Sequence, residues 1–231
     1  MRTIGITHRV KRTTDGEARP TIIAIKDEGG ITRHTLETET DELDFLLGRF
    51  PISWRKVDDG EGVANILPHH IKTTKTGTKV PASYDGYQSD DTVLMSLGGS
   101  GDAFAFALSR RGEEIGARVY RLPSHVLKDK RGDDNKDDDA ELLIGIFLQS
   151  PELFYAVTPR ERDIILVREQ WRARDSAQYA RKACQQRLFQ RAIGRIFLSD
   201  HGRYPEGTIE DSYAAIRAND RVLQNLYAAE K

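Results

Sequence analysis

Residues 92–122 read TVLMSLGGSGDAFAFALSRRGEEIGARVYRL, and this stretch decides the fold class. Thr92–Leu97 is a short apolar run typical of a buried strand, and the turn Gly98-Gly99-Ser100-Gly101 separates it from a helix predicted over Asp102–Arg111. Ala117–Leu122 predicts the next strand. Because strand, helix and strand in this order favour parallel strands covered by helices, the sequence indicates an α/β fold.

The flanking segments extend this pattern. Gly29-Gly30 is a strong turn signal between β-rich runs, so the N-terminal segment predicts an antiparallel meander. The expected strands are Thr3–Thr7, Thr21–Ile25, Ile31–Thr38 and a short one at Trp54–Val57. One helix is expected to be capped by Thr40 or Asp41 and to run to about Gly48, with Leu43, Leu46 and Leu47 on one face. Another is expected over Asp139–Leu148, which opens with acids.

Two domains are predicted, with the boundary near Ser150-Pro151, where a proline follows an apolar helix. Residues 1–150 form the α/β domain, in which the polar segment 58–91 lacks clear periodicity and indicates a long loop or insertion. Residues 151–231 are expected to form a helical hairpin. Its first helix runs from Thr158-Pro159 to about Leu198, and its second covers Thr208–Ala229.

The composition narrows the class of protein. The 231 residues carry 35 Lys+Arg and 36 Asp+Glu, so the chain is neither uniformly basic nor an acidic tail. No run of 18 apolar residues occurs, so no membrane span is expected. The single cysteine, Cys184, cannot form an internal disulfide, which fits a reducing compartment. We therefore expect a soluble cytoplasmic protein.

Basic residues gather in two segments. Between residues 176 and 198 no acid occurs, and Arg187, Arg191 and Arg195 recur at every fourth position, which predicts one stripe on a helix. Arginine forks suit phosphate, so the helix indicates nucleic-acid binding. The candidate contacts on it are Arg174, Arg181, Lys182, Arg187, Arg191 and Arg195, and those in the acid-free segment 65–84 are Lys72, Lys75 and Lys79.

Six carboxylates lie in the nine residues 133–141, and two interpretations of them stay open. The hard oxygens could hold Mg²⁺, with Asp134 and Asp139 as candidate ligands. The cluster could equally be a solvated loop that ends in a capped helix. The adjacent His69-His70 pair predicts no metal site, because no Cys, Asp or Glu lies at ligand spacing near it in the chain.

The order meander, helix, strand, helix, strand, acidic helix and long basic helix resembles the RuvC-like (RNase H-fold) domain of the DEDD insertion-sequence transposases, the relatives of the Piv DNA invertase. TVLMSLGG resembles the family's V-x-E-x-T-G strand end, ARVYRLPSHV its V-x-x-x-x-P strand and turn, and KDDDAELL its D-x-x-D-A-x-x-L helix start. GITHR resembles the first strand, G-I-D-x-H/S. The resemblance implies a mixed five-stranded sheet with flanking helices, followed by the basic helical hairpin.

The family's four metal-binding acids fall on Thr7, Met95, Lys136 and Asp139, so only Asp139 is retained. Such domains resemble two-metal nucleases, and a thioether or an ammonium is a poor Mg²⁺ ligand. The resemblance therefore implies a degenerate site, in which Lys136 neutralises Asp139 and contacts the phosphate instead of a metal. Family members carry a recombinase domain with a serine nucleophile after the helical coil, and no complete transposition reaction is expected from residues 1–231 alone.

The resemblance also implies partners, namely target DNA, a structured RNA, and either further copies of the chain or a partner recombinase, in a nucleoid-associated setting. The leading hypothesis is a transposase-derived nucleic-acid-binding protein with an impaired metal site and no cofactor. A second keeps Mg²⁺-dependent nuclease or transposase activity, with acids supplied from Asp91, Asp102, Asp134 or Asp137. A third is an oligomeric adaptor that binds no nucleic acid.

Overall fold

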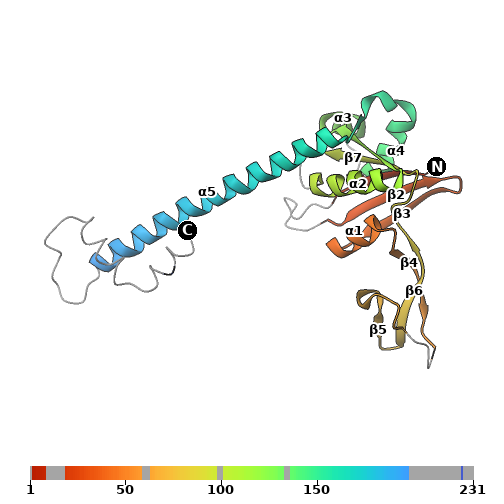
Figure 1. Cartoon of the computed structure of the whole chain (residues 1–231), viewed down its shortest axis with the longest axis horizontal. Helices are drawn as coiled ribbons and strands as arrows, with labels where there is room; N and C mark the ends of the chain where they lie inside the picture. Colours follow the sequence, from red (N-terminus) through yellow and green to blue (C-terminus); the bar gives the residue numbers. More distant parts are fainter. Residues whose placement is uncertain are drawn as a thin grey trace. The chain divides into compact units, whose positions relative to one another are not determined.

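The structure is a computed structural model that describes residues 2–8, 19–58, 63–97, 101–132, 136–197 and 225. The chain divides into two compact units, Met1–Ile165 and Leu166–Lys231. The elements, drawn in Figure 1, are in chain order β1 (Thr3–Thr7), β2 (Thr21–Asp27), β3 (Gly30–Leu36), α1 (Glu39–Leu46), β4 (Phe50–Lys56), η1 (Pro68–His70), β5 (Lys72–Thr74), β6 (Gly77–Asp85), β7 (Thr92–Leu97), α2 (Asp102–Ile115), β8 (Arg118–Pro123), α3 (Ser124–Arg131), η2 (Lys136–Asp138), α4 (Asp139–Gln149), η3 (Pro151–Leu153), β9 (Tyr155–Ala156) and α5 (Pro159–Phe197).

The first unit is built on a mixed six-stranded sheet in the order β3-β2-β1-β7-β8-β9. The strands β1, β2 and β3 form the predicted antiparallel meander, and β7 lies parallel to both β1 and β8. The α/β class and the mixed sheet are therefore confirmed. The sheet has one strand more than expected, because the two residues of β9 pair antiparallel with Tyr120 and Arg121 of β8.

Helices cover both faces of this sheet. On one face α1 and α2 pack over a core that includes Ile4, Ile6, Val93 and Met95, and on the other α3 and α4 pack over a second core. Successive residues of a strand point to opposite faces, so odd and even positions of β1 and β7 contribute to different cores. The sheet is thus the central layer of three.

Gly5 of β1 marks the closest approach between a strand and a helix. A Cβ atom at this position would lie 1.8 Å from the carbonyl oxygen of Ala140 in α4, so only glycine fits there. This contact holds the first turn of α4, which includes Asp139, directly against β1. The sequence of β1 therefore fixes where the acidic helix begins.

The helix α1 is capped by Thr38 and not by Thr40 or Asp41 as predicted. Thr38 caps it through a reciprocal capping box with Asp41. Leu43 and Leu47, predicted to share one apolar face, are 48% and 41% exposed. Phe45 is buried instead. Two acids of the helix are buried as well: Glu42 accepts a hydrogen bond from the Thr21 hydroxyl, and Asp44 forms an ion pair with Arg49. Polar partners thus override the apolar periodicity of this short helix.

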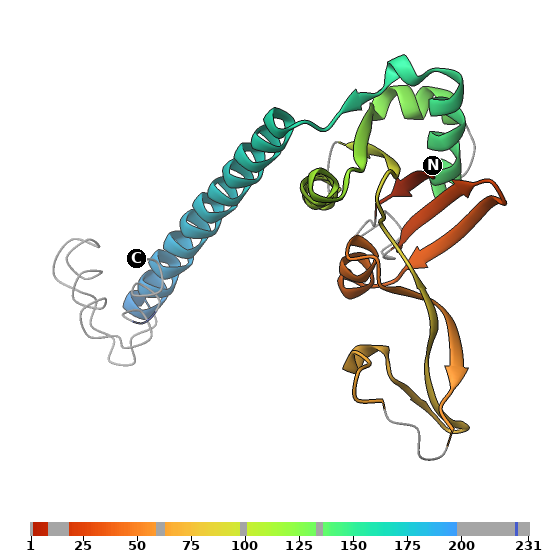
Figure 2. The same ribbon diagram turned by 45° about the vertical axis from the view of Figure 1, so that its right-hand side comes forward.

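The segment 58–91 is not a loop throughout, as the absence of periodicity had suggested. Its strands β5 and β6 join β4 in a second, three-stranded sheet in the order β4-β6-β5. Figure 2 shows β4 leaving α1 and running away from the six-stranded sheet. The first unit therefore carries a small β-module inserted between α1 and β7.

The helix α5 confirms the predicted long basic helix. The first unit ends at Ile165, beyond the predicted boundary at 150, because Phe154, Val157 and Ile165 are buried in its two cores. The second predicted helix, 208–229, lies outside the described residues apart from the helical Asn225. Of the helices in the described part of the chain, none has an apolar stretch sufficient to span a bilayer.

Candidate functional site

A cavity of about 670 Å³ lies where the parallel strands β1 and β7 end. Ligands of open α/β sheets bind beyond the carboxyl ends of the strands, so this is the expected place for a site. Four basic and two acidic side chains are among its lining residues, together with two histidines. They are Arg19, Lys128, Arg131, Lys136, Asp137, Asp139, His8 and His125. The charged side chains of the cavity wall therefore carry a net positive charge.

Three of the four positions carried over from the transposase resemblance line this cavity, namely Thr7, Lys136 and Asp139. The fourth, Met95, does not. It is fully buried in the core under α1 and α2, on the opposite face of the sheet from Thr7. Its neighbour Ser96 lines the cavity in its place, because a shift of one residue along a strand moves a side chain to the other face.

Asp139 is held by an arginine. Its Oδ2 accepts a hydrogen bond from Arg131 Nη1 at 2.6 Å, and the two side chains are 8% and 12% exposed. Burial raises the pKa of the Asp139 carboxyl above its ordinary value, although Arg131 and Lys136 act in the opposite direction. The carboxylate that the family uses for metal binding is thus already paired with a cation.

Two buried oxygen atoms in the cavity, one of them in Asp139 itself, lack a hydrogen-bond partner among the described residues. Thr7 Oγ1 and Asp139 Oδ1 are buried, and neither has a hydrogen-bond partner among the residues that the structure describes. Buried hydroxyl and carboxyl oxygens are normally hydrogen-bonded. Both residues line the cavity, so a ligand seated there could supply the missing partners.

The sequence assigned the neutralising role to Lys136, but the direct contact to Asp139 is made by Arg131. Lys136 lies in η2 on the cavity wall and acts on Asp139 only as a nearby charge. Arg131 could not be predicted as its partner, because it ends α3, a helix that the sequence does not predict. In SHVLKDKR only Leu127 is buried, so the segment shows no apolar periodicity.

Of the acids considered as shifted ligands, Asp137 alone is among the lining residues of the described cavity, and Arg19 Nη1 lies 3.6 Å from its Oδ1. Asp91 lies before β7, at the opposite end of that strand, where Arg2 binds it at 2.8 Å. Asp102 is buried at the start of α2 and does not line the cavity. Asp134 lies outside the described residues.

This set of side chains does not fit Mg²⁺. Mg²⁺ requires several oxygen ligands in near-octahedral geometry, often carboxylates. Here the two lining carboxylates each face an arginine, and Thr7 and Ser96 occupy positions where acids would be needed. The cavity is better suited to an anion than to a divalent cation.

A row of three lysines crosses the small sheet. Lys79 of β6 is the register partner of both Lys56 of β4 and Lys72 of β5, so the three side chains share one face. Trp54 lies two residues before Lys56 on this face, and Lys72 Nζ lies 3.8 Å from its ring centroid. Like charges directly opposite one another destabilise a sheet, so the row indicates a surface that meets negative charge. We call the three lysines, Lys56, Lys72 and Lys79, together with Trp54, the lysine row.

Lys72 and Lys79, predicted as phosphate contacts, belong to the lysine row, and Lys75 lies exposed in the turn between β5 and β6. The other predicted contacts lie on α5 in the second unit. Arg174, Arg181, Lys182, Arg187 and Arg191 are exposed there. Arg195 is helical, and its side chain is outside the described part. Arg174 lies over the exposed Trp171, with 5.6 Å between its Cζ and the ring centroid.

No protein-family model, no curated protein and no solved structure matches the chain.

Three residues of the candidate sites could not be predicted from the sequence, for identifiable reasons. Arg19 and Arg131 reach the cavity from segments without a clear pattern. Lys56 was assigned to a short strand, but its alignment with Lys72 and Lys79 depends on a register that the sequence does not reveal. The usable signal was Trp54 beside basic residues, because aromatic and basic side chains together are typical of single-strand binding.

Proposed function

We propose that the chain is a nucleic-acid-binding protein with a RuvC-like (RNase H-like) sheet, whose former metal cavity binds a phosphodiester without cleaving it. The observation that carries the proposal is the Arg131–Asp139 pair inside a cationic cavity at the ends of β1 and β7. An arginine there keeps the carboxylate from a divalent cation and offers its remaining N–H groups to an anion.

The fold supports this proposal through the order of its elements. An antiparallel meander, a helix, and two parallel strands joined by a helix are followed by the acidic helix and the long basic helix, as the resemblance implied. Thr7 and Asp139 line the same cavity although they are 132 positions apart in the sequence (139 − 7). Their meeting is the arrangement expected of a RuvC-like site.

Phosphate would be bound by groups of different kinds in this cavity. Arg19 and Arg131 present planar N–H forks, whereas Lys128 and Lys136 act as compact positive charges. The hydroxyl of Thr7 can donate to a phosphate oxygen and so satisfy its own buried group. The two carboxylates among the described lining residues, Asp137 and Asp139, each face an arginine, so we expect binding without cleavage.

The lysine row would extend the contact along the strand of nucleic acid. Its three ammonium groups would contact phosphates, with the Lys72 ammonium held over the ring of Trp54. The exposed arginines of α5 form a second basic surface, in the other unit. Both surfaces bind backbone rather than base edges, so weak sequence preference is expected.

The test measures binding of fluorescently labelled single-stranded and duplex DNA and RNA by anisotropy at several salt concentrations. We expect log affinity to fall linearly with log salt. The double variant Lys72→Gln/Lys79→Gln should bind more weakly and reduce the slope by about two, roughly one per lost phosphate contact. Lys26→Gln in β2 removes one lysine charge away from the lysine row and the cavity, and should change neither quantity.

Two outcomes would overturn the proposal. Binding that is absent at low salt for every nucleic acid tried would favour the oligomeric adaptor. Mg²⁺-dependent cleavage that disappears on Asp139→Ala would favour the active nuclease. Cleavage should be assayed on the same labelled substrates, with and without a chelator.

A further inference from the structure

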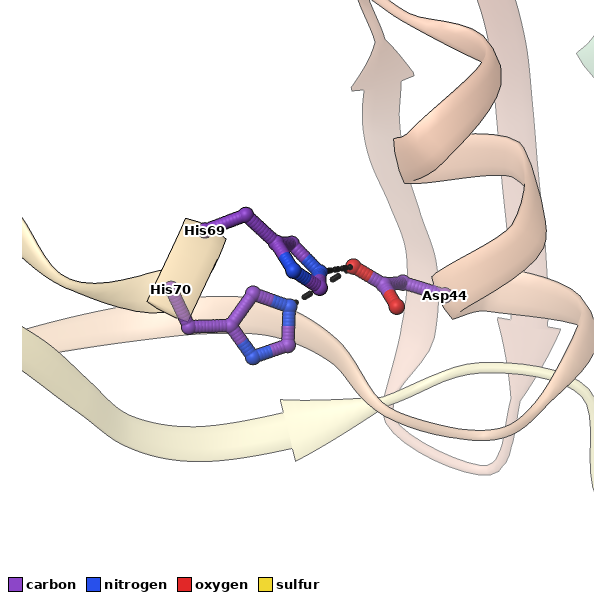
Figure 3. A group of neighbouring side chains, drawn as sticks. All are labelled: Asp44, His69 and His70. Carbon is purple, nitrogen blue, oxygen red and sulfur yellow. Dashed lines mark hydrogen bonds and ion pairs between the residues drawn. The ribbon is translucent and has the colours of Figure 1, made fainter. Parts of the chain in front are cut away.

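A second cluster of polar side chains lies where the small sheet meets α1 (Figure 3). Asp44 of α1 points toward two consecutive histidines of η1, His69 and His70. The Nε2 atoms of both histidines lie against the same carboxylate oxygen, Asp44 Oδ2, at 2.8 Å and 2.7 Å. One oxygen and two imidazole nitrogens therefore converge on one point.

This cluster corrects the expectation that His69-His70 has no acidic neighbour. Asp44 is 25 residues away in the chain, and the fold brings it into contact. Asp44 and His70 are buried, with side chains 1% and 3% exposed, whereas His69 is 41% exposed. The cluster is thus formed inside the protein and is open to solvent on one side.

The surroundings orient Asp44 and His70. Arg49 Nε donates to the other carboxylate oxygen, Asp44 Oδ1, at 2.8 Å. Outer hydrogen bonds of this kind orient the ligands of metal sites, because they leave one ligand atom facing the ion. His70 is buried and held by ring contacts instead: its ring lies 5.5 Å from that of Tyr84 in β6, and 4.3 Å from that of His69.

We propose that Asp44 Oδ2, His69 Nε2 and His70 Nε2 bind one late first-row transition-metal ion, with Zn²⁺ as the ion that best suits this donor set. Two nitrogens and one carboxylate oxygen are a ligand set of zinc sites that leave a fourth position open. Mg²⁺ and Ca²⁺ are disfavoured, because both prefer oxygen ligands.

The geometry is close to what such an ion requires. One ligand atom from each residue lies within 4.8 Å of the other two. Ligands about 2.0–2.2 Å from a tetrahedral zinc ion lie roughly 3.3 Å apart, so each N–O separation has to widen by about half an ångström. The exposed side chain of His69 can make that adjustment, and the solvent on its side can supply water as the fourth ligand.

The ion would fasten the inserted β-module to the main unit. Asp44 belongs to α1, which packs on the six-stranded sheet, and η1 directly precedes β5 of the small sheet. Bound metal would therefore stabilise the junction between α1 and the module. This role is additional to nucleic-acid binding, and it does not depend on it.

The test titrates the chelator-treated full chain with Zn²⁺, and separately with Mg²⁺, by isothermal calorimetry. We expect one Zn²⁺ per chain, a rise in melting temperature on binding, and no heat from Mg²⁺. His69→Ala removes an exposed ligand and should leave the circular dichroism spectrum unchanged. It should lower the affinity for Zn²⁺ by more than the roughly 10- to 100-fold cost of losing an outer hydrogen-bond partner of a ligand.

His34→Ala is the matched control, because His34 lies on β3 outside the cluster. It should bind Zn²⁺ as the wild type does. Replacing zinc by Co²⁺ gives a second readout, since visible absorption bands should appear in the wild type and in His34→Ala and be lost in His69→Ala. Absence of Zn²⁺ uptake by the folded protein, or equal uptake by wild type and His69→Ala, would overturn the proposal.

Discussion

Replacing Gly5 by alanine tests how tightly α4 is held against the sheet. The new methyl group would lie 1.8 Å from the Ala140 carbonyl oxygen and 2.8 Å from its carbon, whereas ordinary contact begins at 3.4 Å. Helix α4 would therefore have to retreat from β1 by about 1.6 Å, the difference between the oxygen distance and ordinary contact. The clash is with backbone, so no rotation of a side chain can relieve it.

Such a retreat should lower the free energy of unfolding, because it separates side chains of α4 from the core on which they pack. A radial gap of about 0.5–1 Å already forfeits a quarter to a half of the dispersion energy of a contact. Leu143 and Ile144 of α4 are almost completely buried in the core beneath the helix, so both would lose contacts. Overpacking typically costs about 1–3 kcal/mol, and we expect Gly5→Ala to reduce the free energy of unfolding by about 3 kcal/mol or more.

Urea denaturation followed by circular dichroism measures this change. Gly145→Ala, in the same helix, is the matched control, because an added Cβ there meets nothing within 4 Å. It should raise the free energy of unfolding by about 0.5–1 kcal/mol through helix propensity. If the two variants had equal stability, the close contact between β1 and α4 would be disproved, and with it the position of Asp139 at the cavity.

Three further predictions concern the cavity and the helix cap. Asp139→Asn should strengthen nucleic-acid binding by up to about tenfold in anisotropy titrations, because it removes a negative charge from a phosphate site, whereas a metal-dependent nuclease would lose activity. The effect of this substitution on stability should depend on pH, because the pKa of the Asp139 carboxyl is raised in the folded state. The carboxyl group therefore makes its full stabilising contribution below the ordinary pKa of 3.8, and this contribution is lost as pH rises through the folded-state pKa. In urea denaturation the wild type should therefore lose stability relative to Asp139→Asn as pH rises, and the opposite trend would contradict the burial of this group. Thr38→Ala should lower the free energy of unfolding by about 1 kcal/mol in the same assay, because it removes the capping box of α1, and an unchanged midpoint would contradict that box.

Much of the main sheet could be predicted from the sequence, because its strands and helices carry strong apolar patterns. The strand Thr92–Leu97 agrees with its prediction to the residue, and α5 agrees almost to the residue. Helix α2 begins at the predicted Asp102 but continues past the predicted end at Arg111 to Ile115. The strand β6 was missed, since in GTKVPASYD only Val80 and Pro81 are buried and a proline interrupts the run. Helix α3 was missed because its only buried residue is Leu127.

The candidate sites depended more on the fold. Thr7, Lys136 and Asp139 were grouped through a resemblance, and the structure places them around one cavity. The fourth position of the resemblance, Met95, does not line the cavity, whereas the next residue, Ser96, does. A shift of one residue along a strand exchanges a side chain in the core for one on the opposite face. Asp44 and His69 are distant in the chain, so no local pattern could pair them.

The way in which the chain enters and leaves the small sheet makes that sheet separable. Phe50, where β4 begins, and Asp85, where β6 ends, are register partners, so the chain departs from and returns to the main body at neighbouring points. Arg2 holds Asp85 at 2.8 Å, and the backbone N–H of Tyr87 donates to Phe45, so the return point is fastened independently of what lies between. A short turn joining Phe50 to Asp85 would remove the small sheet and leave the three-layer body closed. Insertions of this kind can be lost, exchanged or grafted without rebuilding the fold that carries them.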